Sequence, residues 1–253
     1  MSYITKEVKE LVLRNGADLV GIAPAEGWDA PKGHDPKDIM PHAQSVVVIG
    51  IRVLDWIVDH GPPKARIDHH DFILSMIDKV GFEVSRWLAD QGFDAYPVNR
   101  FVGFESEIGA LSQSVRTANW FKALEKDPSF RIFMYGEIPL ALAGYKAGLG
   151  TIGKFSLLIT PQFGPRVNLG AVITNAPLEA DKPLEVDFCK ECYVCAKTCL
   201  GQAISDQGYD VAKCWRAELK EGENVMGVSY RPCPAVCRKN CPVGKLKEKH
   251  QIR

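Results

Sequence analysis

Apolar side chains in residues 1–180 follow two different periods along the chain. Over residues 4–15 they recur every three or four positions, which predicts a helix, and Gly16 follows as a natural stop. The same spacing predicts a long helix over about residues 68–91, ended by Gly92, and a shorter helix over residues 138–147. The apolar face of the long helix would carry Phe72, Met76, Val80, Val84, Trp87 and Leu88.

Short apolar runs between these helices predict strands, which lie at residues 18–23, 45–53, 93–98, 155–160 and 167–174. The run at 45–53 is almost continuously apolar, as is typical of a strand buried on both faces. The last two runs are expected to pair with each other, and the Gly-, Pro- and Asp-rich residues 25–41 are expected to form a loop. Helices that alternate with strands predict an α/β or α+β fold.

All eight cysteines lie between Cys189 and Cys241, and the first four have the spacing C-x2-C-x2-C-x3-C. This is the ligand run of bacterial ferredoxins, in which the fourth cysteine serves a second [4Fe-4S] cluster. We therefore expect two clusters with crossed ligands. Cluster one would take Cys189, Cys192, Cys195 and Cys241, and cluster two would take Cys199, Cys214, Cys233 and Cys237.

The cysteine pattern departs from the ferredoxin one at two places. Leu200 stands where a proline usually follows the fourth cysteine, and the second run is C-x3-C-x3-C. Structural zinc is one alternative, although zinc sites commonly use paired C-x2-C knuckles. Disulfides are another, but residues 1–16 carry no apolar signal-peptide core, so we expect a cytoplasmic protein with reduced thiols.

Composition narrows the set of partners. Lys and Arg together number 31, as do Asp and Glu, so the formal net charge is zero and no global field attracts nucleic acid or an anionic membrane. No apolar run reaches the ~20 residues that span a bilayer. The proline-containing residues 175–183 are expected to connect two domains, 1–183 and 184–253.

Residues 147–199 resemble the core of the cobalamin-dependent epoxyqueuosine reductases and reductive dehalogenases. The resemblance is carried by the motif AGLG-x-x-GK, a TP-x-FG turn and a proline-containing approach to the first cysteine run. It implies a nitroreductase-like cobalamin-binding domain, followed by a ferredoxin-like domain with two [4Fe-4S] clusters, and a base-off cobalamin between them. The implied cofactor-binding residues are Gly148, Gly150, Gly153, Lys154, Thr160 and Arg166.

These assignments have structural alternatives. Gly148 and Gly150 suit a helix C-cap equally well, and Arg166 could be a surface side chain. A reduction that ends at carbon also needs a proton donor. The catalytic aspartate of the epoxyqueuosine reductases aligns with Met134 here, so the sequence departs from that pattern. The remaining proton carriers nearby are Tyr135, our first choice because reductive dehalogenases use a tyrosine, then Glu137 and Tyr145.

The leading functional hypothesis is an enzyme that takes electrons from a ferredoxin or flavodoxin through both clusters to cobalamin, which reduces an unidentified small molecule. A second hypothesis is a non-catalytic electron-transfer module for a partner corrinoid protein or enzyme. A third is reduction of epoxyqueuosine in tRNA. The zero net charge and the end of the chain soon after Cys241 disfavour a nucleic-acid partner.

Overall fold

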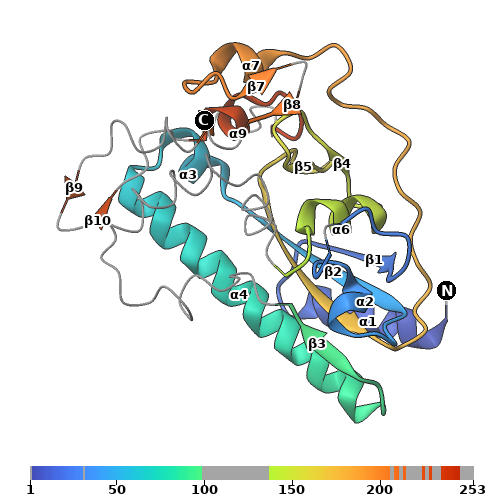
Figure 1. The fold of residues 1–253 in the computed structure, drawn as a ribbon. Helices are drawn as coiled ribbons and strands as arrows, with labels where there is room; N and C mark the ends of the chain where they lie inside the picture. The colour runs from blue at the N-terminus through green and yellow to red at the C-terminus, as the bar shows by residue number, and fades with distance from the viewer. Residues whose placement is uncertain are drawn as a thin grey trace, which may run out of the picture.

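A computed structural model of the chain describes residues 2–30, 32–98, 137–205, 208–210, 213–214, 224–225, 228–229 and 235–245. At its centre lies a four-stranded sheet in the order β1-β2-β6-β3, in which every neighbouring pair is antiparallel (Figure 1). The strands are β1 (Leu19–Pro24), β2 (Ser45–Arg52), β3 (Ala95–Pro97) and β6 (Val167–Thr174). The predicted mixture of helices and strands is confirmed, with an antiparallel central sheet.

The predicted pairing of residues 155–160 with residues 167–174 is wrong. β6 instead pairs with β2 along the full length of both strands, from Ser45 opposite Thr174 to Arg52 opposite Val167. The two strands have matching lengths and continuous apolar runs, so each can be buried on both faces. Residues 158–159 form the short strand β5 (Leu158–Ile159), which pairs with β4 (Thr151–Ile152).

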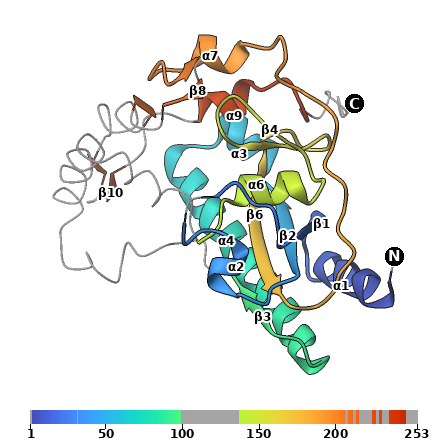
Figure 2. The ribbon, with the colours of Figure 1, turned by 45° about the vertical axis from the view of Figure 1, so that its right-hand side comes forward.

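Helices cover both faces of the sheet. α1 (Tyr3–Arg14) and α4 (Pro63–Asp90) pack against one face, where they meet Val47 and Ile49 of β2. α6 (Leu140–Lys146) covers the other face, where it meets Val46 and Val48 (Figure 2). Because successive strand residues point to opposite faces, the unbroken apolar run of β2 supplies both halves of the core.

The long helix α4 begins earlier than predicted, and its buried face differs from the predicted one in the first two members. Pro63 occupies the first helical turn, a position that proline favours. The buried stripe consists of Ile73, Ile77, Val80, Val84 and Leu88. Phe72 is 70% exposed and Met76 is 43% exposed, so the predicted apolar face was wrong at its first two members.

Two short helices among residues 1–183 were not predicted. α2 (Pro36–Ile39) lies within the expected loop, where Asp35 caps it by accepting a hydrogen bond from the backbone N–H of Lys37. α3 (Asp55–His60) follows β2 directly. Both are too short to show a helical period in the sequence.

The region that contains the cysteines follows the sheet, and we call its described residues from 184 to 245 the cysteine region. It holds α7 (Val194–Thr198), β7 (Ile204–Ser205), β8 (Gly208–Tyr209), β9 (Asn224–Val225), β10 (Val228–Ser229) and α9 (Val236–Asn240). Helices α7 and α9 contact each other, and α9 also contacts α3. Figure 1 shows α7 and α9 at one end of the sheet, above α3 and the β4–β5 hairpin.

The connector between the sheet and the cysteine region is held along β1. The backbone N–H of Asp181 donates to the carbonyl of Ile22, and the N–H of Ile22 donates to the Asp181 carboxylate at 2.8 Å. Lys9 Nζ lies 2.7 Å from both oxygens of the same carboxylate. Within the described residues, no helix combines the length and the apolar character needed to cross a membrane.

Candidate functional site

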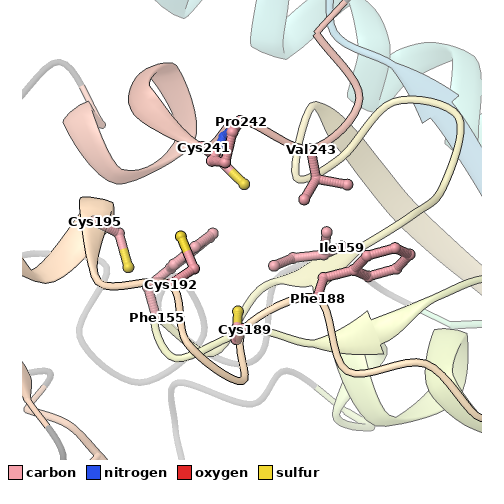
Figure 3. Close-up of a pocket in the computed structure, with 9 residues that line it drawn as sticks. All are labelled: Phe155, Ile159, Phe188, Cys189, Cys192, Cys195, Cys241, Pro242 and Val243. Atoms are coloured by element: carbon pink, nitrogen blue, oxygen red, sulfur yellow. The ribbon is translucent and has the colours of Figure 1, made fainter.

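Four of the predicted ligands line one pocket. Cys189, Cys192 and Cys195 come from the first cysteine run and α7, and Cys241 comes from the residue after α9. Figure 3 shows Cys241 facing Cys189 and Cys192 across a common space. The other lining residues are apolar: Phe155, Ile159, Phe188, Pro242 and Val243. The pocket thus gathers the four cysteines predicted for cluster one, including the distant Cys241.

Burial changes the pKa of two of these thiols. Cys195 and Cys241 are each 5% exposed, and this burial raises the pKa of both thiols. The neighbouring charges of Cys189 and Cys192 raise the two pKa values further, while backbone N–H groups act in the opposite direction. The thiols therefore lie close enough to influence one another.

The described residues also bear on the two alternatives for the cysteines. Cys189, Cys192, Cys195, Cys199 and Cys241 form no disulfides. In the same part of the chain, no three His, Cys, Asp or Glu side chains gather at the spacing of a single metal ion.

The structure describes three of the four cysteines predicted for cluster two. Cys199 accepts a hydrogen bond at Sγ from the backbone N–H of Ala203, 3.3 Å away. Cys199 and Cys237 both pack against the small apolar cluster that includes Phe155 and Ile159. Cys233 lies outside the described residues, so the ligand set of cluster two remains a prediction.

The glycines of the AGLG-x-x-GK motif pack against the chain itself. Gly148 has φ +68°, and a Schellman pair of hydrogen bonds ends α6 there, from Gly148 N–H to Tyr145 O and from Leu149 N–H to Gly144 O. A methyl group on Gly150 would overlap the carbonyl oxygen of Ile159. For Gly148 the helix C-cap alternative is therefore the observed one.

Gly153 and Lys154 complete the motif. A methyl group on Gly153 would meet Ile159 Cδ1 at 2.6 Å. Lys154 Nζ donates to the carbonyl of Cys192 at 3.2 Å and lies 3.5 Å from the centroid of the Tyr193 ring. This cation therefore rests against the first cysteine run, and it links the motif to the pocket.

Thr160 and Arg166 bound a tight turn that we call the 160–166 turn. Thr160 is fully buried, and its hydroxyl accepts from the N–H of Phe163 and donates to the carbonyl of Gly164. Arg166 is 1% exposed, so it is not the surface side chain of the alternative. Its Nη1 lies 2.7 Å from Asp55, and both Nη atoms lie 2.9 Å from Asp59.

The guanidinium of Arg166 lies between α3 and α9. Its guanidinium faces α3 and also donates to the carbonyl of Lys239 in α9, 3.1 Å away, instead of facing an open surface. Burial alone would lower the pKa of Arg166, but the hydrogen bonds and charges of Asp59 and Asp55 raise it. Arg166 is thus the centre of a buried ion-pair network between α3 and α9.

Sequence reasoning missed the two acidic partners of this network. Asp55 and Asp59 lie four residues apart on α3, where like charges repel unless a cation lies between them. That spacing was a signal that a cation lies between the two carboxylates, but it did not identify Arg166 as that cation. Burial raises the pKa of Asp59, but the hydrogen bond and charge of Arg166 outweigh it and leave the pKa below its ordinary value.

The depressed pKa of Asp59 predicts acid sensitivity. The ionised carboxylate stabilises the fold fully above the ordinary aspartate pKa of about 3.9, and this contribution is lost as the pH falls through the lower pKa of the folded state. Asp59→Asn should therefore lower stability at pH 6 and flatten its decline below about pH 4. Urea denaturation at several pH values measures this, with Asp90→Asn at an exposed position as the control.

The structure describes two of the three candidate proton donors. Tyr135 lies outside the described residues. Tyr145 is 37% exposed on α6. Glu137 accepts a hydrogen bond from the hydroxyl of Tyr96, 2.7 Å away, and sequence reasoning missed this partner. Burial, followed by the hydrogen bond and charge of Glu137, raises the pKa of Tyr96 to about 12.

Comparison with known proteins gives sequence relatives for part of the chain, although no family model matches. Epoxyqueuosine reductase of Listeria monocytogenes is 35% identical over 96 residues, which is 38% of this chain and 25% of that protein. Tetrachloroethene reductive dehalogenase of Sulfurospirillum multivorans is 44% identical over 64 residues, which is 24% of this chain and 13% of that protein. The chain therefore matches well under two thirds of the length of either relative.

Solved structures of both kinds share the fold. An epoxyqueuosine reductase crystallised with a modified tRNA stem loop superposes with a TM-score of 0.63 at 19% identity, over 98% of this chain and 67% of that one. A catabolic reductive dehalogenase superposes with a TM-score of 0.64 at 22% identity, over 94% of this chain and 31% of that one.

The chain thus has the mixed α/β fold that solved epoxyqueuosine reductases and reductive dehalogenases share. The predicted resemblance is confirmed: homologues named epoxyqueuosine reductase and homologues named reductive dehalogenase both match.

Proposed function

We propose that the chain is an iron–sulfur reductase that passes electrons through two [4Fe-4S] clusters to a base-off cobalamin, which reduces an organic substrate. The pocket of Cys189, Cys192, Cys195 and Cys241 carries this proposal. These are the four ligands expected for one cluster of a two-cluster ferredoxin pattern, and three of them have C-x2-C-x2-C spacing.

The donor set fits an iron–sulfur cluster. Four thiols converge from two separate segments, and apolar side chains make up the rest of the wall. When bound, a cluster supplies one-electron transfer, and burial and nearby charge adjust its potential. Among the chain's own residues, Phe155, Ile159 and Phe188 would keep water from the pocket, and Lys154 would hold the Cys192 loop in place.

The cobalamin part of the proposal has different support. Gly148, Gly150 and Gly153 pack against the chain's own atoms, and Arg166 is occupied by α3 and α9. These contacts account for the residues without a bound corrinoid, so their role as corrinoid-binding residues stays a prediction. The proposal depends on the motif resemblance and on the relatives named as reductive dehalogenases.

An anaerobic titration of cob(II)alamin into the iron-reconstituted chain, followed by EPR, tests the proposal. We expect two reducible [4Fe-4S] clusters and loss of the nitrogen superhyperfine splitting that the cofactor's own base produces. If the splitting persists while both clusters are reducible, the enzyme proposal fails and the electron-transfer module takes its place. Zinc without iron in the purified and reconstituted protein would refute both.

A second candidate is reduction of epoxyqueuosine in tRNA. One structural relative was solved with a modified tRNA stem loop. A nucleic-acid partner is therefore less disfavoured than the sequence alone indicated. A gel-shift titration with a tRNA stem loop at several salt concentrations separates this candidate from a small-molecule reductase, because phosphate contacts make affinity fall steeply with salt.

The remaining assignments stay proposals. The electron donor would be a ferredoxin or flavodoxin, and the domain boundary would lie near residue 183. The nitroreductase-like character of the first domain and the ferredoxin-like character of the second belong to the same proposal. Tyr135, Glu137 and Tyr145 remain the proposed proton donors.

A further inference from the structure

The segment that carries Cys241 is attached to the 160–166 turn at two points. Cys241 is the last of the eight cysteines, and the other three cysteines of the pocket lie at least 46 positions earlier in the chain, Cys195 being the nearest. A cluster can use this thiol only if the end of the cysteine region is placed correctly. The two attachments lie on either side of Cys241 in the sequence.

The first attachment is a backbone contact between two glycines. Gly164 has φ +55° and Gly244 has φ +71°, a conformation that glycine adopts without strain. A methyl group on Gly164 would overlap the carbonyl oxygen of Val243, and a methyl group on Gly244 would overlap the backbone of Gly164. The backbone of the 160–166 turn therefore lies directly against the residues that follow Cys241.

The second attachment is the ion-pair network around Arg166. Its guanidinium is fixed by Asp55 and Asp59, and it donates to the carbonyl of Lys239 at 3.1 Å, two residues before Cys241. In return, Lys239 Nζ donates to the carbonyl of Asp59 at 2.7 Å. The carbonyl groups at the end of a helix lack partners within the helix, so Arg166 caps the end of α9 from outside.

The turn is closed by its own hydrogen bonds and adjoins the pocket. Thr160 and Gly164 exchange two backbone hydrogen bonds, of 2.9 and 2.8 Å, which close the loop between them. Ile159, directly before the turn, is one of the residues that line the cysteine pocket. The same piece of chain thus contributes to the pocket wall and holds the segment on both sides of Cys241.

We propose that Gly164 and Arg166 are positioning residues for Cys241, so that cluster one is completed only when the cysteine region is docked on the 160–166 turn. This inference rests on the proposed function, because it assumes that Cys241 ligates cluster one. The cluster would then join the two parts of the chain, with three ligands from one segment and the fourth held in place by the sheet side of the molecule.

The test compares Gly164→Ala with Gly92→Ala in the full-length chain. Gly92 has φ +85° and nothing within 4 Å of an added methyl group, so both variants carry the same kind of conformational strain and only Gly164→Ala meets a neighbouring backbone. We expect Gly164→Ala to lose cluster one, about half of the iron, while the EPR signal of cluster two persists. Gly92→Ala should keep both clusters.

A second readout does not depend on the clusters. Alkylation of the iron-free protein, mapped by mass spectrometry, should modify Cys241 about tenfold faster in Gly164→Ala than in the parent, the effect of a local opening made easier by about 1.4 kcal/mol. Arg166→Met should act in the same direction. Arg52→Met is its control, because Arg52 stacks over Phe163 of the same turn, 5.7 Å from the ring centroid.

The outcomes separate the two proposals. Full iron content and unchanged Cys241 alkylation in Gly164→Ala would overturn the positioning role, as would equal losses in Gly92→Ala. If the parent chain itself binds no [4Fe-4S] cluster, the proposed function fails, and the alkylation rates alone then decide whether the turn positions Cys241.

Discussion

Cys195→Ser is expected to remove cluster one and to leave cluster two in place. Cys195 is 5% exposed in the pocket, and a serine hydroxyl is a poor substitute for a soft thiolate toward iron–sulfur clusters. The reconstituted variant should therefore contain about half of the iron of the parent. Iron analysis with EPR of the reduced protein measures the change.

The same experiment tests the crossed ligand assignment. Cys241→Ser should reproduce the spectrum of Cys195→Ser, and Cys199→Ser should reproduce that of Cys214→Ser, because each pair is assigned to one cluster. If Cys241→Ser instead matches Cys214→Ser, the two runs each bind their own cluster and the crossed assignment is wrong.

Ile49→Ala is expected to cause a large loss of stability. Ile49 is fully buried near the middle of β2, opposite Gly170 of β6, and belongs to the core that α1 and α4 cover. Removing three carbons leaves a cavity, so the free energy of unfolding should fall by about 2–5 kcal/mol. Urea denaturation followed by circular dichroism gives the value.

Ile152→Ala is the matched control for this change. Ile152 is 44% exposed in β4, so the same truncation there should change the free energy of unfolding by no more than about 0.5 kcal/mol. Equal losses at the two positions would show that the sheet core described here is not the main source of stability.

The elements that the sequence predicted well are those with a long, uniform pattern. The unbroken apolar run of β2 and the helical period of α1 could be recognised in the sequence, because a buried face requires apolar side chains at regularly repeated positions. The partner of β6 was not visible, because pairing is decided between segments far apart in the chain. The face of α4 was misjudged at Phe72 and Met76 because apolar side chains can also lie at the surface.

The candidate site likewise has a part that could be predicted from the sequence and a part that could not. The cysteine spacing alone suggested that Cys241 joins the first three cysteines, since ligand geometry constrains spacing directly. The role of Arg166 could not be predicted, because its partners Asp55 and Asp59 lie more than a hundred residues away. Nor could the sequence show that Tyr96 donates to Glu137 across the distance between β3 and the start of α6.

The connector at Asp181 has a consequence for how the molecule meets its neighbours. β1 is the last strand on its side of the sheet, and an unpaired edge offers its N–H and carbonyl groups to any extended chain. Asp181 occupies both groups of Ile22, at the middle of that edge. A single proteolytic cut in the connector would therefore expose a β-edge, and the cleaved protein would be prone to aggregate through strand addition.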